Sequence, residues 1–392
     1  MKKLKTTNGF MGSLAPSATV TITAKAQAMQ AAGLDVCSMS AGEPDFDTPE
    51  IIKQAAIDAL IAGKTGYTPS SGISELKQAI AEKFATDNQF KTTPEQIIVA
   101  PGAKFSVFST IAALCGAGDE VMILAPHWVS YPEMVKASGA KSIIVNTSAD
   151  NDYEPQRSEL EAAITENTKL LIINTPSNPT GAIYSKATLT MIAALAIKYN
   201  FMVLADEIYE KLVYDQHKPH ISIASINNQI AELTITVNGF SKAYAMTGWR
   251  IGYLTAPLWL VNKINAIQSN TTSNPTSFAQ YGALKAITDG STAVKTMNRA
   301  FAQRRDLIYK LINEIDGLQA SRPAGAFYIF CNITSFGLSS DQFCQKLLDE
   351  KLVAAIPGQP FGAEGNIRLS YACSETIIIE AVKRLKEFCK KL

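Results

Sequence analysis

Short apolar segments alternate with longer segments of helical spacing along much of the chain, and this alternation limits the possible folds more than any other feature. Gly, Pro or Asp bounds each apolar run, as is typical of buried strands. The expected strands are Gln96–Ala100, Glu120–Leu124, Leu170–Asn174, Met202–Ala205 and Leu233–Val237. The expected helices around and between them include Ile73–Thr86, Phe105–Leu114 and Lys186–Tyr199. This order predicts an α/β fold whose mainly parallel sheet is covered by helices on both faces.

The pattern changes from about residue 290 onward. A long charged helix is expected over Arg299–Ile315, followed by shorter strands and helices that end in Glu375–Lys390. The first 45 residues show no alternation of strand and helix, and we expect them to join the C-terminal part. A chain of 392 residues is also long for one core. We therefore predict a large domain over residues 46–290 and a smaller α+β domain formed by residues 1–45 and 291–392.

Composition argues against several classes of partner. The 36 Lys and Arg nearly balance the 35 Asp and Glu, so the net charge of +1 provides no broad field for nucleic acid. The six cysteines are scattered, with no CxxC pair or histidine cluster, so we expect no metal site. No apolar run has the length of a signal peptide or of a membrane span, which needs about 18 residues. We expect a cytoplasmic protein with unpaired thiols and with no nucleic-acid or membrane partner.

The strongest local signal is the string from Gly239 to Gly252, in which Lys242 lies just after a predicted strand among small residues. Partial desolvation in such a place lowers the pKa of an amine and makes it a nucleophile toward an aldehyde. Ser241 and Arg250 add a hydroxyl and a planar cation, and both groups suit a phosphate. A solvated surface lysine is the alternative, but the whole string makes that interpretation the weaker one.

This string resembles the lysine signature of class I and II aminotransferases, which belong to the fold type I group of pyridoxal 5′-phosphate enzymes. The resemblance extends over nearly the whole chain, through the segments Ser40–Phe46, Gly66–Pro69, Ser177–Gly181, Asp206–Tyr209 and Arg368–Tyr371. It implies that Lys242 is the catalytic residue, that it holds the cofactor as an aldimine, and that amino transfer follows a ping-pong mechanism. It also makes residues 46–290 the cofactor-binding domain.

Several residues are candidates to contact the cofactor ring. Asp206 ends an apolar run, and an acidic residue is needed to keep the ring nitrogen protonated, although a structural or capping role would explain it equally well. The resemblance favours the ring-nitrogen role. It further implies that Asn178 and Tyr209 hydrogen-bond the 3′ oxygen and that Trp128 stacks on the ring.

A second group of residues is a candidate phosphate site. Gly102, Ala103 and Lys104 precede a predicted helix, whose first backbone amides form an anion site. A simple helix cap would look similar, but the resemblance implies that this turn holds the cofactor phosphate together with Ser241 and Arg250. Tyr67 matches a tyrosine that reaches the phosphate from the neighbouring subunit. The resemblance therefore also implies a homodimer with shared active sites.

The substrate is expected to be an amino acid or a 2-oxo acid. A guanidinium binds a carboxylate through two parallel hydrogen bonds, and Arg368 matches the family's anchor for the α-carboxylate. The resemblance places Gly42, Trp128 and Asn178 beside the substrate as well. Lys104 resembles a lysine that binds the side-chain carboxylate, although a role at the phosphate alone stays open.

The segments Ala41–Pro49 and Trp128–Met134 look most like bacterial aspartate aminotransferases of subgroup Ib. This likeness implies transfer of an amino group from L-aspartate to 2-oxoglutarate, which gives oxaloacetate and L-glutamate. Members that also accept prephenate carry a basic residue shortly before Pro-Ser-Ala-Thr. That place holds Ala15 here, which argues against prephenate activity.

Three alternatives stay open at the level of sequence. An aromatic or broad-specificity aminotransferase and a pyridoxal-phosphate-dependent β-lyase would share the lysine, the aspartate and the phosphate contacts. A non-catalytic ligand-sensing regulator is more remote, because such regulators usually add a DNA-binding domain. This chain shows no such domain and retains both Lys242 and Arg368.

Overall fold

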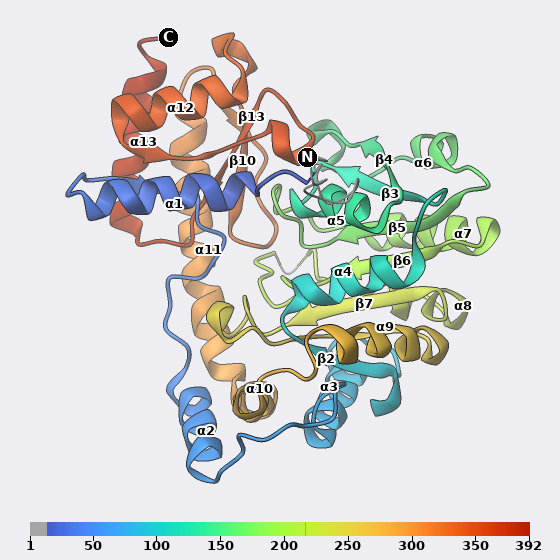
Figure 1. Ribbon diagram of the computed structural model, residues 1–392. Helices are drawn as coiled ribbons and strands as arrows, with labels where there is room; N and C mark the ends of the chain where they lie inside the picture. Colours follow the sequence, from blue (N-terminus) through green and yellow to red (C-terminus); the bar gives the residue numbers. More distant parts are fainter. Residues whose placement is uncertain (1–13, 216) are drawn as a thin grey trace, which may run out of the picture.

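The computed structural model describes residues 14–215 and 217–392. A seven-stranded sheet forms the centre of the larger part (Figure 1). In pairing order its strands are β2 (Ile97–Ala100), β8 (Gly252–Thr255), β7 (Thr234–Gly239), β6 (Met202–Asp206), β5 (Thr168–Asn174), β3 (Glu120–Ala125) and β4 (Lys141–Asn146). Strand β8 pairs antiparallel with both of its neighbours, whereas all other pairs are parallel. The prediction of a mainly parallel sheet is confirmed.

Helices cover both faces of this sheet, because its central strands are apolar on both sides. In β5, Leu170 and Ile172 face one core cluster, while Leu171 and Ile173 face another. The first cluster is closed by α4 (Ala103–Leu114), α5 (Ser130–Ser138) and α9 (Leu258–Thr271). The second is closed by α6 (Arg157–Ala163), α7 (Lys186–Tyr199) and α8 (Asn228–Ala231). A third cluster near β2 packs α2 (Glu50–Ile61), α3 (Ser74–Asp87) and α10 (Ser277–Asp289).

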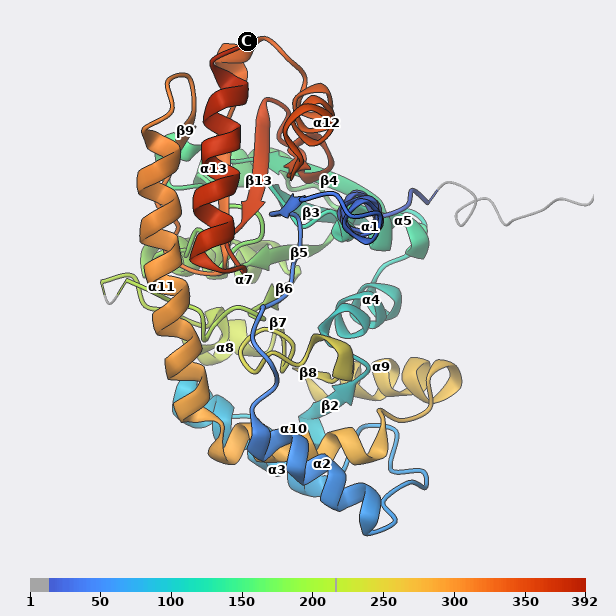
Figure 2. The same ribbon diagram turned by 90° about the vertical axis from the view of Figure 1, so that its left-hand side faces the viewer.

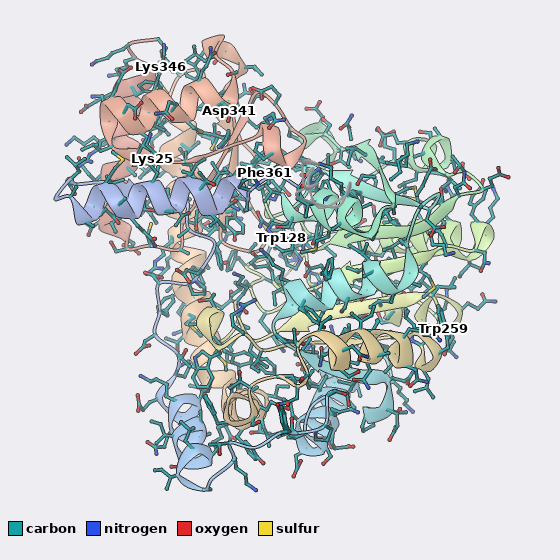
Figure 3. The ribbon with its side chains drawn as sticks, in the orientation of Figure 1. Lys25, Trp128, Trp259, Asp341, Lys346 and Phe361 are labelled. Atoms are coloured by element: carbon teal, nitrogen blue, oxygen red, sulfur yellow. The ribbon has the colours of Figure 1, made fainter. Side chains whose placement is uncertain are left out.

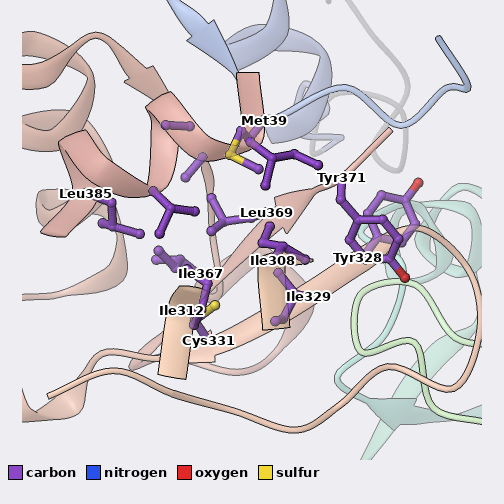
Figure 4. Close-up of a cluster of buried hydrophobic side chains, with 14 of the residues drawn as sticks. Met39, Ile308, Ile312, Tyr328, Ile329, Cys331, Ile367, Leu369, Tyr371 and Leu385 are labelled. Atoms are coloured by element: carbon purple, nitrogen blue, oxygen red, sulfur yellow. The ribbon is translucent and has the colours of Figure 1, made fainter. Parts of the chain in front are cut away.

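The smaller part has an antiparallel sheet of its own and is of the expected α+β type. Its strands pair in the order β12 (Ile356–Pro357), β13 (Asn366–Ser370), β10 (Tyr328–Asn332) and β9 (Gln319–Ala320). Its helices are α12 (Ser340–Lys351), α13 (Glu375–Cys389) and part of α11 (Ser291–Asn313). Figure 4 shows the core of this part, where side chains from both β10 and β13 pack against α11 and α13.

Helix α11 runs beside both parts of the molecule (Figure 2). It contacts α10 at one end, and it contacts α13 and β10 along the rest of its length. The helix begins at Ser291, well before the start expected from sequence. The boundaries at residues 45/46 and 290/291 stay a prediction.

The described part of the first 45 residues contains one helix and one short strand, neither of which was expected from the sequence. Helix α1 (Ala18–Ala31) and strand β1 (Cys37–Ser38) lie there, and β1 pairs with β11 (Val353–Ala354). The sequence of α1 is rich in β-branched residues and buries only Ala26 fully, so it carries little helical periodicity. Its packing against Val36, Leu348 and Ala354 stabilises the helix instead. The pairing places this segment with the C-terminal part, as expected.

The remaining ordered elements are short. Single turns of 3-10 helix lie at Pro94–Gln96, Ala149–Asn151, Ile223–Ser225, Thr247–Trp249, Thr334–Phe336 and Gln359–Phe361. All six cysteines are buried and unpaired, as expected. Across residues 14–215 and 217–392, every helix is too short or too polar to cross a membrane.

Candidate active site

A cavity of about 350 Å³ lies where β5, β6 and β7 end. It brings together most of the predicted site residues: Gly42, Ala103, Lys104, Trp128, Asn178, Asp206, Tyr209, Ser241, Lys242, Arg250 and Arg368. Gly102 lies directly behind this lining, against Arg250. Tyr67 is apart from it, with 92% of its surface exposed. Figure 3 places Trp128 and Phe361 where the two parts of the molecule meet.

Asp206 is the last residue of β6, and its carboxylate is buried in the cavity wall. Its side chain accepts hydrogen bonds from the Tyr131 hydroxyl at 2.7 Å and from the backbone amide of Ile208 at 3.2 Å. Burial raises the pKa of Asp206 to about 6, although these two hydrogen bonds and the nearby Lys242 oppose the rise. A cationic N–H group placed beside it would favour the ionised carboxylate.

Lys242 lies in the turn that follows β7, and its ammonium group donates a hydrogen bond to the backbone carbonyl of Gly42. Burial lowers the pKa of Lys242 to about 8; Glu43 opposes this change, while Arg250, Arg368 and Lys104 reinforce it. A large fraction of the amine is therefore neutral slightly above neutral pH. A neutral amine is the nucleophilic form.

Arg368 comes from β13 of the smaller part and is only 1% exposed. Its guanidinium donates to the side-chain carbonyl of Asn178 at 3.0 Å and to the backbone carbonyl of Ser40 at 2.8 Å. It also stacks on the ring of Tyr328, 4.4 Å from the ring centre, and its Nε has no hydrogen-bond partner among the described residues. Burial lowers the pKa of Arg368, as expected for a cation held without a carboxylate.

Two buried tyrosines connect the larger and smaller parts at this cavity. The hydroxyl groups of Tyr209, which follows β6, and of Tyr328, in β10, lie 2.9 Å apart. A side chain at Gly42 would come within 3.1 Å of the Tyr328 hydroxyl. Glycine at position 42 therefore keeps the space in front of the two hydroxyl groups open.

The turn before α4 is shaped to receive an anion. Gly102 has a φ of +88°, and a Cβ atom there would lie 2.5 Å from Arg250. Gly252, at the start of β8, lets this turn approach closely, because a Cβ atom there would lie 2.3 Å from the amide nitrogen of Ala103. The first amides of α4 have no acceptor within the helix. Together with Arg250 and the buried Ser241, they form a site suited to phosphate.

Comparison with known proteins decides the family. The sequence model described as "Aminotransferase class I and II" matches residues 35–385. The chain belongs to the class I and II aminotransferases.

An aspartate aminotransferase from Bacillus sp. strain YM-2 is 44% identical over 96% of this aminotransferase and 97% of its own length. An aspartate/prephenate aminotransferase from Thermus thermophilus is 42% identical over 94% of this chain and 95% of its own. A solved structure of the Thermus thermophilus aspartate aminotransferase with maleate superimposes with a TM-score of 0.93 at 41% identity, and covers 96% of this chain and 98% of its own. These likenesses confirm the expected fold and enzyme class.

The cofactor of this aminotransferase is pyridoxal 5′-phosphate, and the residues of the cavity fit it. The buried carboxylate of Asp206 would suit the ring nitrogen, the amine of Lys242 would suit the aldehyde, and Arg250 with the α4 amides would suit the phosphate. The charged residues of the lining are Lys104, Asp206, Lys242, Arg250 and Arg368. Four cations and one carboxylate suit the anionic phosphate and carboxylate groups of cofactor and substrate.

Sequence reasoning assigned no role to several residues of this lining. Tyr131 lies in a segment already noted for its resemblance, and Asn174 ends a predicted strand, so both offered a positional signal. Ser17 and Thr19 lie in the Pro-Ser-Ala-Thr segment. Tyr328 gave no signal, because only the folded chain brings β10 against the end of β6.

Proposed function

We propose that this aminotransferase moves the amino group of L-aspartate to 2-oxoglutarate and gives oxaloacetate and L-glutamate. One observation carries the choice of substrates: two cationic side chains, Arg368 and Lys104, line the same cavity. Both substrates are dicarboxylates, and each carboxylate needs a cation. The names of the similar proteins from Bacillus and Thermus support the same choice.

The predicted site residues of the cavity each have a proposed task. When bound, pyridoxal phosphate supplies an aldehyde for the substrate amine and a ring that withdraws electrons. Arg368 binds the α-carboxylate and orients the substrate, and Lys242 moves the proton of the substrate α-carbon as general base and acid. Asp206 holds a proton on the ring nitrogen, while Tyr209 and Asn178 contact the ring oxygen.

The proposed site has further contacts around the cofactor and the substrate. Trp128 covers the ring, and the turn from Gly102 to Lys104 binds the phosphate with Ser241 and Arg250. Gly42 keeps space beside the substrate carboxylate.

A single half-reaction tests the proposal. The holoenzyme is mixed with L-aspartate in the absence of any oxo acid, and the products are quantified. We expect about one oxaloacetate per subunit and no ammonium, followed by L-glutamate when 2-oxoglutarate is added. Continuous release of pyruvate and ammonium from a cysteine conjugate would instead identify a β-lyase. Faster turnover of phenylalanine or tyrosine than of aspartate would identify an aromatic aminotransferase.

Lys104 has two candidate roles within this proposal. Its ammonium lies 4.9 Å from the centre of the Trp128 ring, and burial, with help from Arg250, lowers its pKa. In a Lys104→Met variant, a raised KM for aspartate with unchanged cofactor affinity identifies the side-chain carboxylate as its partner. Weaker cofactor binding with unchanged KM identifies the phosphate.

Prephenate is not proposed as a substrate, although several similar proteins, among them the one from Thermus thermophilus, carry it in their names. The position expected to hold a basic residue has Ala15, whose backbone amide donates to Glu133 at 3.0 Å. Amination of prephenate with L-aspartate as the donor, at a rate comparable to that of 2-oxoglutarate, would contradict this view.

We also propose a homodimer with shared active sites. Tyr67 lies outside the cavity of its own chain and is exposed, and α2 exposes Ile57, Leu60 and Ile61. Mixing a Tyr67→Phe variant with an inactive Lys242→Ala variant tests the arrangement. Recovered activity is expected, because one site of the mixed dimer then has both native residues. No recovery, together with a monomeric mass in solution, would contradict the dimer.

Cytoplasmic localisation stays a prediction.

A further inference from the structure

A buried polar cluster lies behind Asp206, on the side away from the cavity. We call it the rear network, and it consists of Lys83, Asn88, Glu207, Glu210 and His220. Lys83 and Asn88 come from the end of α3, whereas Glu207 and Glu210 belong to the turn that follows β6. Lys83 also lines a surface hollow, and none of the five lines the active-site cavity.

The members of the rear network contact one another closely. The Asn88 amide donates to Glu207 at 3.1 Å and to Glu210 at 2.7 Å, and Lys83 donates to the side-chain carbonyl of Asn88 at 2.6 Å. Lys83 also makes an ion pair with Glu210. The His220 Nε2 lies 3.2 Å from a Glu207 oxygen. Glu207 is only 1% exposed, and its second oxygen has no hydrogen-bond partner among the described residues.

The charges of this cluster are distributed unevenly. Burial raises the pKa of Glu210, but Lys83, His220 and Lys211 outweigh it and hold that pKa at about 2. Glu210 is therefore an anion neutralised by Lys83. Glu207 has no Lys or Arg partner among the described residues, and its only ion-pair contact there is His220. The spacing of Glu207, Glu210 and His220 would also suit a metal, but the Lys83 ammonium already occupies the cationic position.

The rear network is joined to the cofactor site by the turn itself. Asp206 and Tyr209 face the cavity, whereas Glu207 and Glu210 face the rear network, so the two sets alternate along five residues. Burial is the main cause of the raised pKa of Asp206, and the charge of Glu207 adds to it. The charge of Glu210 is neutralised by Lys83. Any cation that binds Asp206 therefore also lies in the field of Glu207.

We propose that Glu207 is a positioning residue that places a second negative charge behind Asp206 and thereby keeps the ring nitrogen of the cofactor protonated. Asn88 holds its carboxylate in place through a hydrogen bond, and His220 lies beside it. This inference rests on the proposed role of Asp206 at the ring nitrogen. It adds that Asp206 does not act alone, because the charge directly behind it stabilises the same proton.

A Glu207→Gln substitution removes the charge and keeps the shape and the acceptor for Asn88. Two measurements follow its effect on the cofactor. The first is the Kd of the apoenzyme for pyridoxamine 5′-phosphate, which binds without a bond to Lys242. The second is the ¹⁵N chemical shift of the ring nitrogen in holoenzyme loaded with labelled cofactor. We expect the pKa of the ring nitrogen to fall by about half to one unit in this variant. Such a fall corresponds to about three- to tenfold weaker binding of pyridoxamine 5′-phosphate, and it moves the ¹⁵N chemical shift toward that of neutral pyridine.

Two variants separate this effect from a merely structural one. Glu210→Gln breaks the ion pair with Lys83, so it should lower the melting temperature at least as much as Glu207→Gln does, yet leave the Kd and the ¹⁵N shift near wild type. Glu207→Asp keeps the charge and should restore the wild-type ¹⁵N shift. The inference is overturned if Glu207→Gln lowers only the melting temperature, or if Glu210→Gln moves the ¹⁵N shift equally.

Two further variants make every result decisive. If Asp206→Asn leaves the ¹⁵N shift unchanged, the proposed role of Asp206 fails; if Asp206→Asn moves it and Glu207→Gln does not, only the present inference fails. If Glu207→Gln does not fold, His220→Gln tests the same charge, because it removes the ionisable neighbour of Glu207. Cofactor binding must then be as tight as in the wild type or tighter, and weaker binding at an unchanged melting temperature overturns the inference.

Discussion

Replacing Arg368 by methionine should separate the stability of this enzyme from its activity. Arg368 is a cation with 1% exposure and no ion pair among the described residues, so its burial costs several kcal/mol. Two hydrogen bonds, to Asn178 and Ser40, and stacking on Tyr328 offset most of this cost. We therefore expect Arg368→Met to change the free energy of unfolding of the apoenzyme by no more than about 2 kcal/mol in either direction.

The effect on activity should be far larger. The guanidinium is proposed to make two charge-assisted hydrogen bonds with the substrate carboxylate, each of which contributes about 1.5–3 kcal/mol. Losing both should lower kcat/KM for aspartate and for 2-oxoglutarate by about 10²- to 10⁴-fold. Both substrates should be affected alike, because each presents the same carboxylate to Arg368.

Chemical denaturation and steady-state kinetics measure the two effects separately. Maleate, a dicarboxylate without an amine, adds a binding assay: at 100 times its Kd it should stabilise the wild-type protein by about 2.7 kcal/mol and the variant by almost nothing. Arg305→Met is a matched control. Arg305 is also buried, stacks on Tyr214 and donates to a backbone carbonyl, but it pairs with Asp306 and lies away from the cavity.

We expect the control to lose stability and to keep its kcat/KM. The reasoning would be refuted if Arg368→Met lost more than about 4 kcal/mol of stability, since the arginine would then be mainly structural. It would equally be refuted if maleate still stabilised the variant.

Three further predictions follow from the geometry. The pKa of Asp206 is raised from 3.8 to about 6 in the folded protein, so the free energy of unfolding of wild-type apoenzyme should fall by about 2 kcal/mol relative to Asp206→Asn as the pH rises from 4 to 6; an equal pH dependence of the free energy of unfolding in the two proteins, measured by urea titration, would contradict this. Gly102→Ala should weaken cofactor binding by more than about tenfold through its clash with Arg250, whereas Gly63→Ala, with a similar positive φ but open surroundings, should leave the Kd unchanged. Reductive labelling of the Lys242 amine in apoenzyme by a small aldehyde should rise around pH 8; a rise only near pH 10 would mean that burial does not lower its pKa.

Sequence reasoning predicted the larger part well because its signals are local. The strands of the central sheet are short apolar runs between turn residues, and β3, β5, β6 and β7 lie within a few residues of their expected positions. Parallel strands also bring residues that follow them to the same edge of the sheet, so Asp206 and Lys242 could be expected in one site. Strand β4, which is partly exposed, and strand β8, which begins at Gly252, were missed.

The features that sequence reasoning missed depend on contacts between segments that are distant in the sequence. Helix α1 has no clear apolar stripe and is held by its packing against Leu348 and Ala354. Tyr328 reaches Tyr209 across 119 residues of sequence, and no local pattern encodes such a pair. The rear network was missed for the same reason, since Lys83 and Asn88 lie at the end of a helix whose sequence shows no sign of buried polar contacts. Buried polar contacts of this kind depend on the tertiary fold alone.

The charged side chains of the cavity explain why it is suited to charged ligands. None of Lys104, Asp206, Lys242, Arg250 and Arg368 makes an ion pair with another described residue. The buried Lys83, by contrast, pairs with Glu210. Two members of this set, Asp206 and Arg368, are also buried, and a buried charge without a partner destabilises the folded protein. Cofactor and substrate supply opposite charges, so Asp206 and Arg368, which weaken the apoenzyme, contribute binding energy in the loaded enzyme.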